Sequence, residues 1–289
     1  MKTDLTVSRR GVIVAGCAFA ATPLPSFAAS ALPTDPAKQN EAYVKILGRT
    51  DGGRVVKKTR GIVMAVLPDA IVPLYGFRNS ESAWWRQIGD HSWVRFPSVL
   101  SFFTDLETDQ FIDTFVSPFN GKEVQLMPSY IRHKEGELFT PTGHYYGSMK
   151  TAFPDLYPDE ELQLNWTMDG DDIRMQRSSN FPPMIPQPSL ESVSFFASAK
   201  EVLDPDVTDA HYRSAGWNIF SGTRAPYQEL GILPGHAIWH YDAVKLDRVE
   251  DCDADYLERA RAYTPLFDQS PELDEGPSFF ERFTTNGQP

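Results

Sequence analysis

The chain has 289 residues, of which 41% are hydrophobic and 12% aromatic, enough apolar material for a substantial folded core. Its 27 lysines and arginines stand against 39 aspartates and glutamates, and the formal charge of -12 disfavours nucleic acids and anionic membranes as partners. Cys17 and Cys252 are the only cysteines, which excludes a zinc ribbon and a disulfide framework. The composition therefore indicates an acidic globular protein whose fold depends on its hydrophobic core.

Residues 1–30 are typical of an export signal. Arg9 and Arg10 precede a short, mildly apolar stretch at 11–21, which is followed by two prolines and a small-residue cleavage site ending at Ala28. The arginine pair resembles a twin-arginine signal, which implies the twin-arginine translocase and signal peptidase as transient partners and the periplasm as destination. A Sec signal is the alternative. The prolines interrupt the apolar stretch too early for stable membrane insertion.

Cys17 leaves a second outcome open for this leader. Residues 14–17 also fit a lipobox, in which a lipidated Cys17 would retain the protein on a membrane. The cleavage site downstream favours soluble release over this lipoprotein alternative. Once the leader is removed, Cys252 is the only cysteine, and the aspartates around it disfavour a thiolate and a nucleophilic role.

The mature chain is predicted to form one mainly β domain at 43–267, after a linker at 31–42 and before a C-terminal tail at 268–289. The predicted hairpins are 84–88 and 91–96 around Gly89-Asp90, 111–116 and 122–127 around Asn120-Gly121, 130–133 and 137–139 around Glu135-Gly136, and 162–168 and 173–177 around Asp169-Gly170. Four successive hairpins favour an antiparallel meander. Such a meander closes into a barrel, our first choice, or packs as a sandwich, because both arrangements remove its edges.

Three further segments complete the predicted fold. Residues 181–188 contain four prolines and are expected to cross one end of the sheet as an extended loop. Residues 192–202 predict another strand, which ends before Asp204-Pro205. Apolar residues at three-to-four spacing in 253–267 predict an amphipathic helix that covers one end of the barrel.

Several turn-rich fragments together resemble a known family. They are 104–108 (TDLET), 117–124 (SPFNGKEV), 166–172 (WTMDGDD) and 234–240 (PGHAIWH), followed by Lys245-Leu246. The arrangement resembles the bacterial domain of unknown function 1838 family over about residues 43–267, and members of that family often carry twin-arginine signals. The resemblance implies a periplasmic β-rich domain. It implies no reaction and supplies no catalytic residues.

Familiar catalytic motifs are missing from the chain. It contains no Gly-x-Gly-x-x-Gly before a helix, P-loop, His-Glu-x-x-His, Gly-x-Ser-x-Gly or Ser-x-x-Lys. Dinucleotide enzymes, P-loop kinases, zincins and α/β-hydrolases are therefore disfavoured.

The candidate catalytic residues are His236, His240 and Asp242, with Tyr145 as a further candidate. In a strand, His236, Ile238, His240 and Asp242 would share one face, and Ala237, Trp239 and Tyr241 would share the other. Two imidazoles and a carboxylate can form an acid-base group, or His236 and His240 can hold a metal. A structural pair of hydrogen-bonded histidines is the alternative, and no cofactor is predicted.

The candidate ligand-binding residues are mainly tryptophans, because indole rings inside a barrel offer a flat apolar wall. They are Trp84, Trp85, Trp93, Trp166 and Trp239, together with His144, Arg86 and Arg95. Ordinary core packing is the alternative for the indoles. Arg86 or Arg95 would pair with a ligand carboxylate or face solvent.

Four functions are compatible with these features. The leading hypothesis is a soluble periplasmic β-barrel that binds a small apolar or aromatic molecule. A cofactor-free lyase, isomerase or hydrolase using the same cavity is the alternative, followed by a metal-dependent oxidoreductase and by a structural or interaction protein. A cavity lined by His236 or His240 would support the first two, whereas exposed histidines over a filled interior would count against both.

Overall fold

The computed structural model describes residues 32–146, 165–181, 189–221, 224–225, 228–229 and 236–276 of the chain. The expected export signal at 1–30, with Cys17, and residues 182–188 of the expected proline-rich loop lie outside the described residues.

Strands dominate the described part of the chain. They are β1 (Gly53–Val66), β2 (Ile71–Gly89), β3 (Ser92–Thr104), β4 (Thr114–Val116), β5 (Glu123–Gln125), β6 (Ser129–Arg132), β7 (Glu137–Thr140), β8 (Gly143–Tyr146), β9 (Asn165–Asp169), β10 (Asp172–Phe181), β11 (Ser189–Ser198), β12 (Tyr212–Ser221), β13 (Arg224–Ala225), β14 (Gln228–Glu229) and β15 (His236–Leu246). The helices are α1 (Pro36–Leu47), α3 (Ala199–Leu203) and α4 (Ala254–Tyr263), with the short 3-10 helices η1 (Val249–Asp251) and η2 (Pro271–Leu273).

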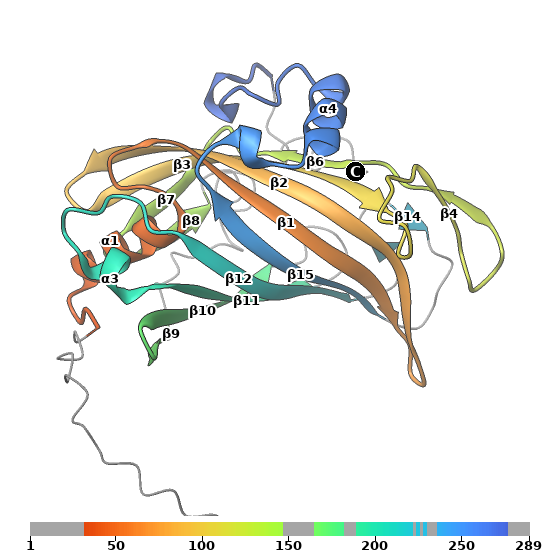
Figure 1. Cartoon of the computed structure of the whole chain (residues 1–289), viewed down its shortest axis with the longest axis horizontal. Helices are drawn as coiled ribbons and strands as arrows, with labels where there is room; N and C mark the ends of the chain where they lie inside the picture. Colours follow the sequence, from red (N-terminus) through yellow and green to blue (C-terminus); the bar gives the residue numbers. More distant parts are fainter. Residues whose placement is uncertain are drawn as a thin grey trace, which may run out of the picture. The chain divides into compact units, whose positions relative to one another are not determined.

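Eleven strands form one antiparallel sheet that curls into a half-barrel (Figure 1). The strand order is β8-β7-β3-β2-β1-β15-β12-β11-β10-β9, and β6 pairs with β3. The pairs β4-β5 and β13-β14 form two separate ribbons. This architecture confirms the prediction of a mainly β, antiparallel fold, and among the described strands the barrel is open because β8 and β9 do not pair with each other.

The centre of the sheet depends on a pairing between distant parts of the chain. β15 lies between β1 and β12, with Val56 opposite Leu246 and Val66 opposite His236 at the two ends of the β1 register. Local hairpins build the two halves of the sheet, and β15 joins them. The fold is therefore more than a simple meander, because its central contact closes a loop of well over 100 residues.

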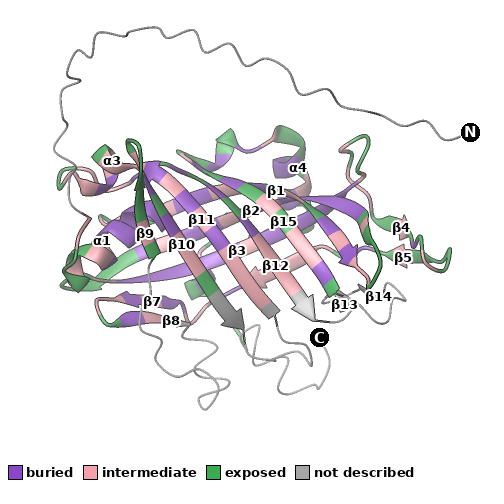
Figure 2. Ribbon diagram, turned by 90° about the horizontal axis from the view of Figure 1, so that it is seen from below, coloured by how far each residue is buried: buried purple, intermediate pink, exposed green. Residues whose placement is uncertain are grey.

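The two faces of the sheet are covered by different helices. On the inner face, Tyr43 of α1 is buried in one apolar cluster with Val55 and Trp85. On the outer face, Tyr256 of α4 is buried in another cluster with Leu100. Figure 2 shows many buried positions along α1 and β3, whereas β4 and β5 are exposed or half-buried.

Helix α1 is anchored at both ends. The side chain of Asp35 accepts a hydrogen bond from the backbone N–H of Lys38 at 3.0 Å, which caps the first turn. At the other end, the buried ammonium of Lys245 donates to the carbonyl oxygens of Lys45 and Ile46 at 3.0 and 3.2 Å. Since the last carbonyl groups of a helix lack partners within it, Lys245 of β15 holds α1 against the inner face.

Helix α4 confirms the predicted C-terminal helix and packs on the outer face. The hydroxyl of Tyr256 donates to the carbonyl oxygen of Leu100 at 2.7 Å and accepts from the backbone N–H of Ser80 at 3.0 Å. These contacts place α4 over β2 and β3. The helix therefore covers a face of the sheet and not one end of the barrel, which was the position predicted from the sequence.

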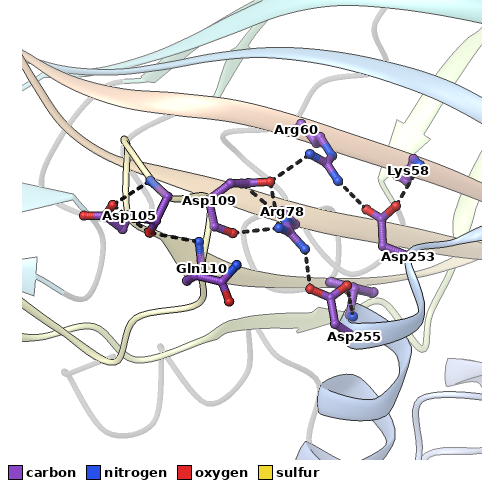
Figure 3. Close-up of polar contacts among 10 residues, drawn as sticks. Lys58, Arg60, Arg78, Asp105, Asp109, Gln110, Asp253 and Asp255 are labelled. Carbon is purple, nitrogen blue, oxygen red and sulfur yellow. Dashed lines mark hydrogen bonds and ion pairs between the residues drawn. The ribbon is translucent and has the colours of Figure 1, made fainter.

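An ionic network fixes the start of α4 to the sheet (Figure 3). The guanidinium of Arg78, whose side chain is 9% exposed, lies 2.7 Å from a carboxylate oxygen of Asp109 and 2.6 Å from one of Asp255. Arg60 pairs with Asp109 at 2.9 Å and with Asp253 at 2.8 Å. Asp253 and Asp255 lie at the start of α4, where the positive end of the helix dipole stabilises their carboxylates. These charges compensate one another and serve to dock α4.

Three of the predicted hairpins are confirmed. The turns between β4 and β5 and between β9 and β10 contain Gly121 and Gly170, whose φ angles of 68° and 64° favour glycine. The hairpin of β2 and β3 turns at residues 90 and 91, one position later than predicted, because Gly89 still pairs with Ser92. His91 adopts the left-handed conformation there, with φ at 51°.

The hairpin predicted around Glu135-Gly136 is wrong. β6 and β7 both pair with β3, at Ser98–Ser101 and at Trp93–Arg95 respectively, and follow one another along the same side of it. The backbone N–H of His133 donates to the carbonyl oxygen of Pro97 at 3.0 Å, so the chain stays on β3 between the two strands. The turn residues therefore mark an interruption of one edge.

Other predicted boundaries also change. The strand expected at 192–202 ends at Ser198 and continues as α3, and the helix expected at 253–267 spans Ala254–Tyr263. Part of the expected linker at 31–42 belongs to α1. In the expected tail, η2 precedes Asp274, whose carboxylate accepts from Nε of Arg132 at 2.6 Å.

Candidate functional site

The inner face carries a row of residues that neighbouring strands place side by side. Across β10, β11, β12, β15, β1 and β2, the row consists of Arg177, Val193, Gly216, Tyr241, Gly61 and Phe77. Tyr241 therefore has a glycine directly opposite it on both neighbouring strands. Glycine weakens the interior of a strand and often marks a close approach of another group to the backbone.

The phenol of Tyr241 occupies the space above Gly216. A Cβ atom at Gly216 would lie 2.8 Å from the hydroxyl oxygen of Tyr241, closer than van der Waals contact allows. A Cβ atom at Gly61 would lie 2.6 Å from the ring of Phe77. Because Gly216 has no side chain, the phenol can lie across β12 and reach β11.

Tyr241 belongs to a chain of hydrogen bonds that ends on α1. Its hydroxyl donates to Oε1 of Glu191 at 2.9 Å, and Nη2 of Arg177 donates to Oε2 of Glu191 at 2.8 Å. Nη1 of Arg177 donates to the hydroxyl of Tyr43 at 3.2 Å. Burial raises the pKa of Tyr241 well above its usual range, and the carboxylate of Glu191 raises it further. Tyr241 is therefore a protonated phenol at neutral pH.

A second group of charges lies on β1, β2, β3, β7 and β8. Nε of Arg95 lies 2.5 Å from Oε2 of Glu137, and its Nη1 lies 3.1 Å from Oε1 of Glu81. Nζ of Lys57 lies 2.7 Å from Oε2 of Glu81, and Nε2 of His144 lies 3.4 Å from Oε2 of Glu137. These contacts join three cationic or imidazole side chains to two carboxylates.

The ionisation of this second group follows from its pairing. Burial by itself would raise the pKa of Glu81, but Lys57 and Arg95 lower it to about 2. Burial likewise opposes ionisation of Glu137, and Arg95 followed by His144 holds its pKa well below the usual range. Burial lowers the pKa of His144. At neutral pH, two carboxylates therefore face a neutral imidazole and the side chains of Lys57 and Arg95.

Aromatic rings connect the two groups. The ring of His144 stacks on Phe139 with centroids 4.2 Å apart, and Phe139 lies 4.9 Å from Trp85 and 5.6 Å from Tyr43. Tyr43 in turn accepts the hydrogen bond from Arg177. The connected polar residues form the inner cluster, which consists of Tyr43, Lys57, Glu81, Arg95, Glu137, His144, Arg177, Glu191 and Tyr241.

The inner cluster combines the elements of a small-molecule site. Rings provide apolar surface, and a few fixed polar groups lie among them, which is the usual composition of such sites. The side chains of Arg177 and Glu191 are 14% and 16% exposed, so they are not fully withdrawn from solvent. The pair of Glu137 and His144 also has the chemistry of an imidazole oriented by a carboxylate.

Several predicted site residues do lie on the inner face. Trp85, Trp93, Trp239, His144 and Arg95 are among them, and Trp166 of β9 packs half-buried against the same apolar cluster. Nε1 of Trp93 donates to the carbonyl oxygen of Thr50 at 2.9 Å, and Trp239 packs on Phe77 with centroids 4.9 Å apart. His144 and Arg95 belong to the inner cluster, whereas Trp85 and Trp93 are almost completely buried core residues.

His236, His240 and Asp242 share one face of β15, as the alternation predicted. That face is the outer one, and all three side chains are exposed. The sheet separates them from the inner cluster. Their acid-base role stays a prediction, to which the inner cluster adds no support. Tyr145 lies in β8 opposite Leu138, and its side chain lies outside what the structure describes.

Trp84 and Arg86 also lie on the outer face. The guanidinium of Arg54 lies over the half-buried ring of Trp84, 5.0 Å from its centroid. Arg86 is exposed, and its Nη1 lies 2.7 Å from Oε1 of Glu272. Arg86 and Arg95 thus differ: the first pairs at the surface and the second is buried with two glutamates.

Most of the inner cluster was not anticipated from the sequence. The missed residues are Tyr43, Lys57, Glu81, Glu137, Arg177, Glu191 and Tyr241. One usable signal was present, because Gly61 and Gly216 interrupt otherwise regular strand segments. Recognising that signal requires the register of three strands that lie far apart in the sequence.

Cys252 is buried, and burial raises the pKa of its thiol to about 11, in keeping with the predicted lack of nucleophilic character. Within the described residues, no group of three or more His, Cys, Asp or Glu side chains is placed to hold a metal ion. No helix in the described part of the chain is long and apolar enough to cross a membrane.

Comparison with known proteins links most of the chain to one family. The family described as "Protein of unknown function (DUF1838)" matches residues 74–279. The matched range begins in β2 and therefore includes Glu81, Glu191 and Tyr241, while α1 and β1 precede it. No curated protein and no solved structure matches the chain significantly.

Proposed function

The chain belongs to the DUF1838 family, whose description names no function, and we propose that it is an exported periplasmic protein that binds a small apolar or aromatic molecule on the inner face of its half-barrel. The observation that carries the proposal is the placement of Tyr241 between Gly61 and Gly216. Two glycines at one level of a sheet weaken it. The hydrogen-bonded phenol explains the need for glycine at Gly216, whereas at Gly61 the carbonyl oxygen of His240 and the ring of Phe77 occupy the space of a side chain.

The surroundings of Tyr241 support an apolar or aromatic ligand. Trp239 precedes it by two residues on the same face and packs against Phe77 and Phe103, with centroids 4.9 and 5.9 Å apart. Rings fixed in this way offer a rigid apolar wall at small entropic cost. The partly buried hydrogen bond of Tyr241 with Glu191 provides the polar group that orients a ligand.

Native mass spectrometry of protein purified from the periplasm tests binding. The key variant is Gly216→Val, whose side chain would collide with the phenol of Tyr241. Ala215→Val is the matched control, because Ala215 is the adjacent residue of β12 and is exposed on the outer face. We expect a retained small molecule in the wild type and the control, and its loss from Gly216→Val.

Two results would contradict binding on the inner face. One is wild-type protein that carries no small molecule, and the other is equal retention by Gly216→Val and the wild type. Should Gly216→Val fail to fold, Tyr241→Phe removes only the hydroxyl and replaces it as the test. Circular dichroism of each variant establishes that the sheet is intact.

Export is tested separately, at the N-terminus of the mature protein. Cleavage after Ala28 predicts that the periplasmic protein begins at Ala29. Replacing Arg9 and Arg10 by lysine is expected to block export by the twin-arginine route. A diacylated Cys17 would instead establish the lipoprotein alternative, and export that persists in the double lysine variant would refute the twin-arginine route.

A cofactor-free lyase, isomerase or hydrolase is the second candidate, favoured by the buried pair of Glu137 and His144. Their oxygen and nitrogen atoms lie 3.4 Å apart, which suits an imidazole that accepts a proton from a substrate. If the site is catalytic, His144→Ala should retain a substrate that differs from the molecule bound to the wild type: in mass for a lyase or hydrolase, and in the NMR spectrum of the released molecule at equal mass for an isomerase. The same molecule in both proteins would refute catalysis by His144 and leave binding intact.

A further inference from the structure

The amide of Asn218 is the most informative polar group beside the proposed binding site. Asn218 lies in β12 on the inner face, opposite Glu191 of β11 and Trp239 of β15. Its side-chain oxygen Oδ1 is inaccessible to solvent, and it has no hydrogen-bond partner in the part of the chain that the structure describes. The phenol of Tyr241 lies over Gly216, which is two residues earlier on the same face of β12. Asn218 therefore lies next to the feature that defines the site.

A buried carbonyl oxygen without a partner is unusual in a folded protein. Buried acceptors are nearly always satisfied, since leaving one unpaired forfeits the hydrogen bond it made to water. The neighbouring side chain opposite Asn218 on β11 is Glu191, which has acceptor oxygens and no proton to offer when ionised. A hydrogen-bond donor on a bound molecule would satisfy Oδ1 once rotation of the Asn218 side chain, or movement of its neighbours, opens the oxygen to the ligand.

The carboxylate of Glu191, next to Asn218, already accepts hydrogen bonds from donors of the protein itself. Both carboxylate oxygens of Glu191 accept hydrogen bonds, from Tyr241 and from Arg177. The hydroxyl of Tyr241 uses its proton in that bond, so towards a ligand it offers lone pairs. This end of the site is therefore rich in acceptors, and a complementary ligand brings a donor.

The charges of the inner cluster argue against an ionic ligand. Lys57, Arg95 and Arg177 are matched by Glu81, Glu137 and Glu191, and each of these six side chains lies within 3.1 Å of an opposite charge. An anion or cation entering beside them would be left without a counter-charge or would separate an existing pair, which is costly in a partly buried site.

On the basis of the proposed binding function, we infer that the ligand is a neutral phenol, that is, an uncharged aromatic molecule with a hydroxyl group. Its hydroxyl donates a hydrogen bond to Oδ1 of Asn218. The aromatic ring lies along the wall to which Trp239 belongs, and the hydroxyl lies at the acceptor-rich end of the site. Asn218 thereby determines specificity for a donor, while Trp239 and its neighbouring rings provide the apolar surface.

Titration calorimetry of the mature protein with three small probes tests the hydrogen-bond donor and the lack of charge separately. The probes are 4-methylphenol, its methyl ether 4-methylanisole, which lacks the donor, and the anion 4-methylbenzoate. We expect 4-methylphenol to bind about tenfold more tightly than the ether, as the loss of one hydrogen bond to a buried acceptor predicts. We expect the benzoate to bind more weakly still.

Two variants assign the preference to Asn218. Asn218→Leu should bind 4-methylphenol and 4-methylanisole with equal affinity, because leucine removes the acceptor and has a side chain of similar shape. Asn165→Leu is the control, since Asn165 is exposed at the start of β9, and it should keep the tenfold preference. A preference that survives in Asn218→Leu would overturn the role of Asn218.

The remaining outcomes distinguish the ligand class from the binding function. Equal binding of the phenol and the ether by the wild type overturns the inferred donor, and tightest binding of the benzoate overturns an uncharged ligand; both leave binding on the inner face standing. If no probe binds while native mass spectrometry shows a retained molecule, the phenol class is refuted alone. If no probe binds and no molecule is retained, the proposed function fails as well.

Discussion

Replacement of Glu81 by glutamine tests how the buried charges of the inner cluster stabilise the fold. The carboxylate of Glu81 accepts from Lys57 at 2.7 Å and from Arg95 at 3.1 Å, and its side chain is 15% exposed. Glutamine keeps the size of the side chain and removes its charge. The change therefore removes one carboxylate from between two cations and leaves Arg95 paired with Glu137.

The magnitude follows from the pKa of Glu81. Burial opposes ionisation, yet the two cations lower the pKa from 4.5 to about 2. At about 1.4 kcal/mol for each tenfold change in an ionisation constant, the ionised side chain stabilises the folded state by roughly 3 kcal/mol at pH 7. We expect Glu81→Gln to lower the free energy of unfolding by about this amount.

The same linkage predicts how the effect depends on pH. The pKa of Glu81 is lower in the folded than in the unfolded protein, so the stabilisation is complete above pH 4.5 and is lost as the pH falls through 2. At pH 3 roughly 2 of the 3 kcal/mol should be lost. The difference between wild type and Glu81→Gln is then about 1 kcal/mol, because the glutamine does not titrate.

Urea unfolding of the wild type and Glu81→Gln at pH 7 and pH 3, followed by circular dichroism and tryptophan fluorescence, measures this difference. Glu258→Gln is the control, because Glu258 is exposed on α4, and it should change stability by less than about 0.5 kcal/mol at either pH. A cost of less than about 1 kcal/mol for Glu81→Gln at pH 7, or an effect that is the same at both pH values, would refute a stabilising role of the Glu81 carboxylate.

Three further predictions concern stability and reactivity. Lys245→Met should lower the free energy of unfolding in urea by roughly 3–5 kcal/mol, because it leaves the carboxylate of Asp209 and the last carbonyl groups of α1 without their buried donor. A loss below about 1 kcal/mol would contradict that anchoring role. Asp35→Ala should cost about 1 kcal/mol in the same assay through loss of the N-cap, whereas Asp35→Asn should be nearly neutral. Cys252 should resist iodoacetamide at pH 8 in the folded protein and react after unfolding in urea, since its thiol is buried with a pKa of about 11; rapid modification of the folded protein would show that it is accessible.

Local patterns in the sequence predicted most of the strands. The turns at Gly121 and Gly170 were recognisable because a positive φ angle favours glycine whatever the rest of the fold does. The helix at Ala254–Tyr263 was recognisable from apolar spacing. The hairpin at Glu135-Gly136 was wrong for an equally local reason: a turn signal reveals that the chain departs from a strand, but it does not show which strand the next segment pairs with.

The sequence by itself determined the mainly antiparallel β fold, the C-terminal helix, and the sharing of one strand face by His236, His240 and Asp242. Each of these was predicted from a pattern among residues near each other along the chain: strand alternation, turn residues or apolar spacing. Only the tertiary structure decided that this shared face is the outer one, because α1 packs on the opposite side of the sheet. It also decided that Gly61 and Gly216 flank Tyr241, because that arrangement is set by the register of distant strands, which no local pattern encodes.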